Sequence, residues 1–263
     1  MEIRDSRILL TGASGGIGLE LARQLLEAGA RLLVVGRQGP ALQALVQRRP
    51  DRVQAVVADL TTAQGRAAVA DAARDFGGLD ALVNAAGVND FAWLEQQDED
   101  AIAALLQLNV TATLQLTHRL LPLLRRSRGA VIANVGSTFG SIGYPGFAAY
   151  CASKFAIRGF SQALRRELAD TGIRVLYVAP RATRTAMNGA AVTRMNEQLG
   201  VAMDDPAVVA ACILRALRGG RDEVYLGWPE KLFVRLNALW PRLVDRALRR
   251  QLPVVRGFAR PGA

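Results

Sequence analysis

Short uninterrupted apolar runs alternate with helix-length segments along most of the chain, and this alternation restricts the possible folds more than any other feature. The runs occupy residues 8–10, 31–35, 53–57, 81–83, 130–135, 174–178 and 223–226. Runs that are apolar throughout indicate strands covered on both faces, and helix-length connections allow neighbouring strands to lie parallel. The sequence therefore predicts an α/β fold in which helices cover both faces of a doubly wound, parallel, seven-stranded sheet.

The length of 263 residues is ordinary for one such sheet domain, and no linker divides the chain. We expect one domain over residues 1–227, with residues 228–263 as a basic, amphipathic helical extension of it. The hydrophobic share of 51% argues against disorder. One histidine and two cysteines are too few for a zinc site or a disulfide framework, so no metal is expected.

The start of the chain is charged and runs directly into a strand, without the pattern of a signal peptide. No apolar run approaches the ~20 residues that a membrane-spanning helix needs. We therefore expect a cytoplasmic protein.

A glycine-rich segment joins the first predicted strand to the first predicted helix. It reads Thr11-Gly12-Ala13-Ser14-Gly15-Gly16-Ile17-Gly18. Gly12 allows a tight turn, Gly16 lets the backbone approach a pyrophosphate, and Gly18 lets the helix pack closely on the strand. The amino end of the helix offers unpaired N–H groups and a partial positive charge to the phosphates. In this setting the segment predicts a dinucleotide site, and a plain glycine-rich turn is the alternative.

Tyr150 and Lys154 are four residues apart, which places them on one face of a helix, one turn apart. An ammonium group near a phenol favours the phenolate and lowers its pKa from the usual value of about 10. Tyr150 can then give a proton to a carbonyl oxygen or take one from an alcohol. Ser137 follows the fifth strand, and its hydroxyl can donate a hydrogen bond to the oxygen that becomes negative. Taken alone, Ser137 could equally be a turn residue at a strand end.

In this order the motifs resemble those of the classical short-chain dehydrogenase/reductase family, over residues 7–185. The family's loop has the spacing Thr-Gly-x-x-x-Gly-x-Gly, and its active site joins Tyr-x-x-x-Lys to a preceding serine. Asn109, at the expected start of a helix, stands at the family's usual asparagine position. The resemblance implies a Rossmann fold and a catalytic set of Asn109, Ser137, Tyr150 and Lys154. In this set a water held by Asn109 links the lysine to solvent.

The resemblance also implies contacts to a nicotinamide dinucleotide along the carboxyl ends of the strands. Residues 84–87 stand where the family usually has Asn-Asn-Ala-Gly, with Ala85 replacing the second asparagine. Asp59 and Leu60 stand where the family contacts the adenine ring. The residues expected to bind the cofactor are Gly12, Ser14, Gly16, Ile17, Gly18, Arg37, Asp59, Leu60, Asn84, Gly87, Tyr150, Lys154, Pro180, Thr183 and Thr185.

The end of the second strand bears on which dinucleotide binds. An NAD site needs a carboxylate here to accept hydrogen bonds from the ribose 2′-hydroxyl. Gly36 stands where NAD-preferring relatives carry aspartate, and the guanidinium of Arg37 suits a 2′-phosphate through charge-assisted bonds. We therefore expect NADP(H). A solvated Arg37 is the alternative, and it would still leave NAD without an acidic partner.

Pro180-Arg181 replaces the Pro-Gly that the family usually carries after the sixth strand, whereas Thr185 keeps the family's threonine. If this position required a positive φ, an arginine would cost about 1 kcal/mol or more. We expect accommodation without strain first, a contact to phosphate second and a contact to substrate third.

Residues 185–203 are expected to form a lid over the substrate. The apolar side chains expected at the pocket are Met187, Val192, Met195, Leu199 and Met203 from the lid, and Phe139, Tyr144 and Phe147 from the loop before Tyr150. They indicate a small hydrophobic ketone or alcohol as substrate. Methionines that merely pack the lid are an equal alternative.

The tail carries more than half of the net charge of +10. Its basic residues are Lys231, Arg235, Arg242, Arg246, Arg249, Arg250, Arg256 and Arg260. Pro229 and Pro241 each suit the first turn of a helix, and Pro253 is expected to end the second helix. We expect the apolar side of these helices to pack on the body or on another subunit of a homodimer or homotetramer. A peripheral contact with the inner membrane surface is the alternative, and no motif supports nucleic-acid binding.

These expectations combine into one function. The chain is expected to be an NADP(H)-dependent oxidoreductase, a ketoreductase or alcohol dehydrogenase that transfers hydride between nicotinamide and a ketone or secondary alcohol. A dinucleotide-sensing regulatory protein on the same fold is the alternative from another class. The full set of serine, tyrosine, lysine and asparagine favours the enzyme, because a sensor needs no proton donor.

Overall fold

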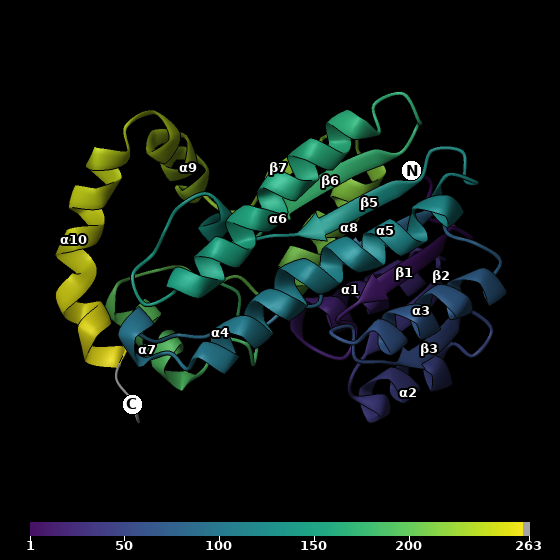
Figure 1. Cartoon of the computed structure of the whole chain (residues 1–263), viewed down its shortest axis with the longest axis horizontal. Helices are drawn as coiled ribbons and strands as arrows, with labels where there is room; N and C mark the ends of the chain where they lie inside the picture. Colours follow the sequence, from purple (N-terminus) through teal and green to yellow (C-terminus); the bar gives the residue numbers. More distant parts are fainter. Residues whose placement is uncertain (260–263) are drawn as a thin grey trace.

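The computed structural model describes residues 1–259, and a sheet of seven strands forms its centre (Figure 1). The strands are β1 Arg7–Thr11, β2 Arg31–Gly36, β3 Val53–Val57, β4 Ala81–Asn84, β5 Val131–Val135, β6 Arg174–Ala179 and β7 Glu223–Tyr225. They lie in the order β3-β2-β1-β4-β5-β6-β7, and every neighbouring pair is parallel. The predicted fold class and seven-stranded sheet are confirmed.

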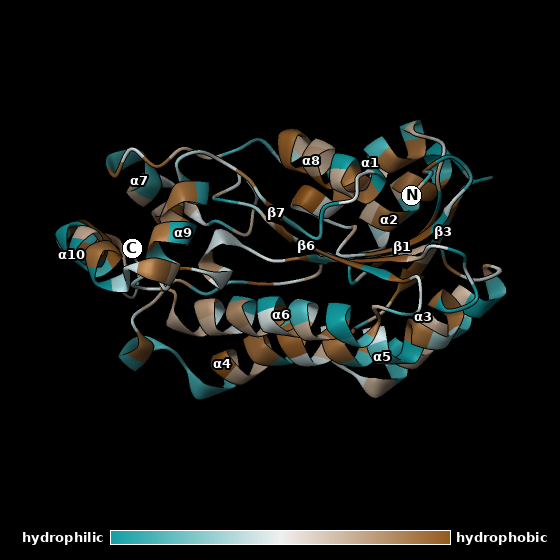
Figure 2. Cartoon of the chain, turned by 90° about the horizontal axis from the view of Figure 1, so that it is seen from above, coloured by the Kyte–Doolittle hydropathy of each residue, from teal (hydrophilic) through white to brown (hydrophobic). Residues whose placement is uncertain are grey.

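Helices cover both faces of the sheet, as strands that are apolar throughout require. The helices are α1 Gly16–Glu27, α2 Gly39–Arg48, α3 Ala63–Asp75, α4 Glu99–Leu106, α5 Thr113–Leu124, α6 Ala148–Glu167, α7 Ala190–Gln198, α8 Pro206–Arg218, α9 Glu230–Leu239 and α10 Pro241–Phe258. In Figure 2, α1, α2 and α8 lie on one face, and α3, α5 and α6 lie on the other. Among the residues that the structure describes, no helix is both long and apolar enough to cross a membrane.

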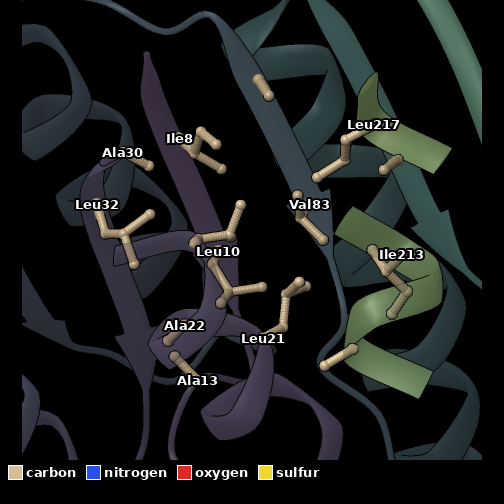
Figure 3. Close-up of a cluster of buried hydrophobic side chains, with 14 of the residues drawn as sticks. Ile8, Leu10, Ala13, Leu21, Ala22, Ala30, Leu32, Val83, Ile213 and Leu217 are labelled. Atoms are coloured by element: carbon tan, nitrogen blue, oxygen red, sulfur yellow. The ribbon is translucent and has the colours of Figure 1, made fainter. Parts of the chain in front are cut away.

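The largest part of the core lies between the sheet and the first of these layers. Ile8 and Leu10 of β1 pack in one cluster with Leu32 of β2, Leu21 of α1 and Ile213 of α8 (Figure 3). All five side chains are fully buried. Burial of each such side chain stabilises the fold by about 1.5–3 kcal/mol. This packing holds α1, and the loop that precedes it, firmly against β1.

The strand order creates a crevice at the carboxyl edge of the sheet. The chain moves outward from β1 to β2 and β3, and then crosses back to β4 on the other side of β1. The connections after β1 and β4 therefore leave the edge in opposite directions. In open α/β sheets, ligands bind at this point of reversal.

Asn109 does not open a helix, which corrects the expectation from the sequence. Helix α4, a π-helical turn (Gln107–Ala112) and α5 follow one another without a break, and Asn109 lies inside the wide turn. A π turn accommodates one extra residue within a helix and is frequent at functional sites. The apolar pattern of the segment did not reveal this change in hydrogen bonding.

The tail forms two helices, α9 and α10, at the end of the molecule opposite to β3 (Figure 1). Pro253, which was expected to end the second helix, lies inside α10, and the helix continues to Phe258. Proline removes one backbone donor, but Pro253 and Arg249 are both exposed, so the carbonyl group that loses its partner lies on the solvent side. Arg260, counted above with the basic tail, lies outside the described residues.

Candidate active site

Loops that follow six of the strands enclose a cavity of about 630 Å³ at the carboxyl edge of the sheet. This volume is within the range of cofactor and substrate sites. The predicted site residues that line the cavity are Gly12, Ser14, Gly16, Ile17, Gly18, Arg37, Leu60, Gly87, Ser137, Tyr150, Lys154, Pro180, Thr183 and Thr185. Asp59, Asn84 and Asn109 lie outside this lining.

The turn between β1 and α1 has the backbone conformation that its glycine spacing predicts. Gly12 and Gly16 have φ of 71° and 47°, in the left-handed region that glycine enters without strain. A Cβ at Gly18 would overlap the Gly12 carbonyl oxygen, so the helix approaches the strand more closely than a side chain would allow. Within the described chain, no side chain caps the amino end of α1. Its N–H groups therefore suit the pyrophosphate of a dinucleotide.

Thr11, at the end of β1, ties the loop after β1 to the loop after β4. Its hydroxyl oxygen accepts hydrogen bonds from the N–H groups of Ala85 at 3.0 Å and Ala86 at 3.1 Å. This bridge fixes the width of the crevice between the two loops. The sequence motif includes Thr11, but its role in joining the loops becomes visible only when β4 lies beside β1.

Asn84 belongs to a buried polar network rather than to the cavity wall. Its side-chain amide donates to Asn134 Oδ1 at 2.8 Å and to Thr117 Oγ1 at 3.1 Å. Asn134 in turn donates to Ser161 Oγ at 2.9 Å. The network satisfies polar groups that burial would otherwise penalise, and it joins β4 and β5 to α5 and α6. No feature of the sequence predicted the pairing of Asn84 with Asn134.

Arg37 and Leu60 line the cavity near the ends of β2 and β3, whereas Asp59 is not part of its lining. The Asp59 carboxylate accepts hydrogen bonds from the N–H group of Thr61 at 2.9 Å and from its hydroxyl at 2.7 Å. These bonds, with a smaller contribution from Arg37, hold the pKa of Asp59 below its ordinary value. Asp59 therefore shapes the loop that presents Leu60.

Tyr150 and Lys154 lie on α6 and both line the cavity. Burial raises the pKa of Tyr150 to about 12, although a hydrogen bond with Ser137 opposes the rise. Burial lowers the pKa of Lys154 to about 8. The lysine ammonium lies 5.6 Å from the centroid of the tyrosine ring and donates to the Val135 carbonyl oxygen at 3.2 Å. The sequence predicted a lowered pKa for Tyr150, but in the protein alone burial raises it.

Asn109 lies beside the lysine, although it does not line the cavity. Its Oδ1 accepts from the Val88 N–H at 2.9 Å, and its Nδ2 donates to the Val88 carbonyl oxygen at 2.8 Å and to Ser153 Oγ at 3.0 Å. A Cβ placed on Gly87 would lie 3.1 Å from Asn109 Oδ1 and 3.6 Å from Lys154 Nζ. The π turn thus brings Asn109 to the lysine and to the loop after β4.

Ser137 is positioned by Tyr177, a residue that the sequence did not suggest. The Tyr177 hydroxyl donates to the Ser137 carbonyl oxygen at 3.1 Å and accepts from the Ser137 N–H at 3.4 Å. Tyr177 is fully buried, and a Cβ on Gly136 or on Gly140 would overlap it. The only available signal was one tyrosine among the aliphatic residues at positions 175–179.

Arg181, which replaces the family's glycine, fits without backbone strain. Among the described residues other than glycine, only Asp5 has a positive φ. The Arg181 guanidinium bonds to Asp204 at 2.8 Å and to Glu230 at 3.3 Å. It lines the cavity, but two carboxylates already neutralise it. This agrees with the first-ranked expectation of accommodation without strain.

An aromatic and aliphatic cluster closes the other end of the cavity. Phe139, Tyr144 and Phe147 stack closely, with ring centroids 5.0 Å apart for Phe139 and Tyr144. Val192 and Met195 of α7 are buried in the same cluster and line the cavity. Met187 lines it too, Leu199 packs at the edge of the cluster, and Met203 does neither.

The last helix supports this end of the cavity from outside. Gln251 of α10 accepts a hydrogen bond from the Tyr144 hydroxyl at 2.7 Å. Val255 is fully buried against the cluster that contains Phe147 and Met195. The sequence did not indicate that the tail reaches the site.

The arrangement combines a glycine-rich turn before an uncapped helix, a tyrosine hydroxyl with a nearby lysine, and an apolar chamber in one cavity. It suits a dinucleotide held along the strand ends, with its reactive end near Tyr150 and an apolar reactant beside Phe147. Such a site can add or remove a proton at a substrate oxygen.

Comparison with known proteins gives consistent matches. A family model described as short chain dehydrogenase matches residues 6–196. The chain is 33% identical over 267 aligned residues to dehydrogenase/reductase SDR family member 7B of Bos taurus, covering 94% of this chain and 81% of that protein. It is 37% identical over 204 residues to nodulation protein G of Rhizobium meliloti, covering 77% of this chain and 83% of that protein.

Solved structures agree with these matches. A short-chain dehydrogenase from Burkholderia cenocepacia in complex with NADP has a TM-score of 0.82 at 29% identity, covering 94% of this chain and 99% of the other. A short-chain dehydrogenase from Streptomyces avermitilis has a TM-score of 0.81 at 31% identity, covering 96% and 98%.

Proposed function

The chain belongs to the short-chain dehydrogenase/reductase family of NAD(P)-dependent oxidoreductases, and from that premise we propose that it uses NADP(H) to interconvert a hydrophobic ketone and its secondary alcohol. One observation carries the proposal. Arg37, without an acidic residue at position 36, lines the same cavity as Tyr150 and the apolar chamber.

The preference for NADP(H) rests on the end of β2. A Cβ on Gly36 would lie 2.8 Å from Ser14 Oγ, so an aspartate there would require Ser14 to move. Arg37 is exposed and forms no ion pair within the described part of the chain. Its guanidinium is therefore available to a 2′-phosphate through charge-assisted hydrogen bonds. The Burkholderia cenocepacia relative was solved with NADP, which supports this preference.

The chain's own residues would manage the proton and the substrate oxygen. A nicotinamide dinucleotide bound along the glycine-rich turn supplies the hydride. Tyr150 gives its hydroxyl proton to the substrate oxygen in reduction and takes one back in oxidation. The Ser137 hydroxyl donates a hydrogen bond to the same oxygen. Lys154 places a positive charge near Tyr150, and Asn109 holds the loop that faces the lysine.

The substrate class follows from the chamber beyond Tyr150. Its walls include Phe139, Phe147, Val192 and Met195, which offer apolar surface and few hydrogen-bonding groups. Arg181, a charged residue of the lining, is paired with Asp204 and Glu230. The chamber therefore favours an uncharged, hydrophobic carbonyl compound over an acid.

Oxidation of NADPH and NADH, measured against a panel of ketones, acyl thioesters and quinones, tests the proposal. Arg37→Gln should lower kcat/KM for NADPH by roughly 10–100-fold, because hydrogen bonds to charged groups contribute about 1.5–3 kcal/mol. The same change should leave NADH almost unaffected. Arg126→Gln, at an exposed arginine outside the cavity, is the matched control. Equal use of NADPH and NADH by the unmodified protein would contradict the cofactor preference.

A further inference from the structure

Large exposed apolar side chains are concentrated on the tail. Six of the twelve in the described chain lie within residues 228–243, and we call them the outer apolar patch. The patch consists of Trp228, Leu232, Phe233, Leu239, Trp240 and Leu243. Trp228 is 69% exposed, Leu239 67% and Trp240 61%. Soluble surfaces carry single apolar residues routinely, but a gathering of this kind marks a contact site.

The patch is not needed to fasten the tail to the body. Val234 of α9 and Val244 of α10 are buried with Ile142 in one cluster. Asn237 donates to the Ser141 carbonyl oxygen at 2.9 Å. The inner face of both helices is thus covered, as expected. The outer face keeps Leu239, Trp240 and Leu243 exposed, which corrects the expectation that the whole apolar side is covered.

The two helices that carry the patch also carry a high density of positive charge. Lys231, Arg235, Arg242, Arg246, Arg249, Arg250 and Arg256 are all exposed. None of them forms an ion pair within residues 1–259. Of the two acidic residues in this stretch, Glu230 is already paired with Arg181, which leaves only Asp245. This surface, with its unpaired basic residues, is therefore suited to an anionic partner.

We propose that the outer face of the α9–α10 pair docks on an anionic lipid bilayer. Tryptophan side chains prefer the boundary between headgroups and acyl chains, and leucine and phenylalanine side chains enter the apolar layer. Each arginine or lysine near the surface adds attraction to anionic headgroups. Self-association through this face fits less well, because a twofold interface would set one basic surface against another.

Docking in this way would bring the substrate chamber close to the lipid. Figure 1 shows α10 as the outermost element at its end of the molecule. The same helix contacts the chamber through Gln251 and Val255. A hydrophobic substrate dissolved in the bilayer would then be near its site. This last link rests on the proposed function, whereas the docking itself rests on residues outside the cofactor site.

Sedimentation of the full chain with vesicles tests the docking. Binding to phosphatidylcholine vesicles that contain phosphatidylglycerol should be strong at low salt and weaken at high salt, and pure phosphatidylcholine should bind far less. Trp240→Ser with Leu243→Ser should weaken binding by about tenfold or more. Leu94→Ser, at a 60% exposed leucine outside the patch, is the matched control and should bind normally. Arg242→Gln with Arg246→Gln should weaken binding by about tenfold.

Tryptophan fluorescence gives a second readout that does not depend on activity. The chain has three tryptophans, and Trp93→Phe leaves only Trp228 and Trp240. Brominated lipids included in the anionic vesicles should quench the emission of these two tryptophans when the protein binds the vesicles. Absence of vesicle binding, or binding that the patch variant retains in full, would overturn the proposal. A patch variant with lower oligomeric mass and no lipid effect would assign the face to contact between copies of the chain instead.

Discussion

Replacing Tyr177 by phenylalanine tests whether a residue outside the cavity sets the position of Ser137. The change removes one oxygen and, with it, the hydrogen bonds to the carbonyl oxygen and N–H of Ser137. The carbonyl oxygen keeps a second donor, the Gly140 N–H at 2.9 Å. The Ser137 N–H has no other partner within residues 1–259, and an unpaired, partly buried donor costs about 1–3 kcal/mol.

Two measurements follow from this loss. For a chain of this length, about 2 kcal/mol corresponds to a fall in Tm of roughly 4–8 °C by calorimetry. A shift of about 1 Å in a catalytic group costs up to roughly 100-fold in rate. We therefore expect kcat to fall by about tenfold or more, while the KM for NADPH stays unchanged, because the role proposed for Ser137 is a hydrogen bond to the substrate oxygen and not to the cofactor.

Tyr225→Phe is the matched control for this experiment. Tyr225 packs edge-on against Tyr177, with ring centroids 6.2 Å apart, but its hydroxyl bonds to Ser141 and Glu223. This variant should lose some stability and keep its kcat. If Tyr177→Phe has a lower Tm but the kcat of the unmodified protein, then Tyr177 stabilises the fold and does not position Ser137 for catalysis.

Three further predictions concern the proposed active site and the ion pairs that join Arg181 to Asp204 and to Glu230 of α9. Tyr150→Phe should bind NADPH normally, by fluorescence titration, and lose nearly all turnover; substantial remaining turnover would remove Tyr150 as the proton donor. Arg181→Ala should destabilise the protein by about 2 kcal/mol, because two partly buried carboxylates lose their partner. Amide hydrogen exchange in α9 should then become faster, because Glu230 at the start of α9 loses its ion pair with Arg181. Unchanged exchange in α9 would show that this ion pair does not stabilise the helix. Burial lowers the pKa of Lys154 from 10.5 to about 8, so between these values the unfolded chain binds more protons than the folded chain. Stability of the unmodified protein, measured by urea unfolding, should therefore rise through this window relative to Lys154→Met. If the free energy of unfolding depended on pH in the same way for both proteins, the lowered pKa of Lys154 would be contradicted.

The sheet and much of the cavity could be predicted from the sequence because their signals are local. Each strand is a short apolar run, and the glycine-rich turn carries its own spacing. Ser137 and Tyr150 follow the same strand, β5, so their approach in space needs little knowledge of the rest of the fold. These features depend on residues that are close together in the sequence, so the sequence pattern reveals them directly.

The remaining features depend on contacts between distant segments. Tyr177 meets Ser137 across 40 residues, and Gln251 meets Tyr144 across 107. Asn84 faces a network instead of the cavity because β4 and β5 lie side by side. The π turn at Asn109 differs from an α-helix only in hydrogen bonding, which residue types do not encode. Exposure of the outer apolar patch likewise depends on which face of α9 the body covers.

Because α10 packs behind the apolar end of the cavity, part of the support for this end comes from a stretch of chain far from the residues proposed for catalysis. The residues proposed to bind the dinucleotide and move the proton end at Thr185, whereas Gln251 and Val255 follow the last strand. Genetic recombination that exchanged only the last helix would leave the wall residues Phe139, Phe147, Val192 and Met195 in place and would change the packing behind them. Divergence of the C-terminal segment among related chains would therefore alter the shape of this end of the cavity, while the sheet and the residues proposed for catalysis stay unchanged.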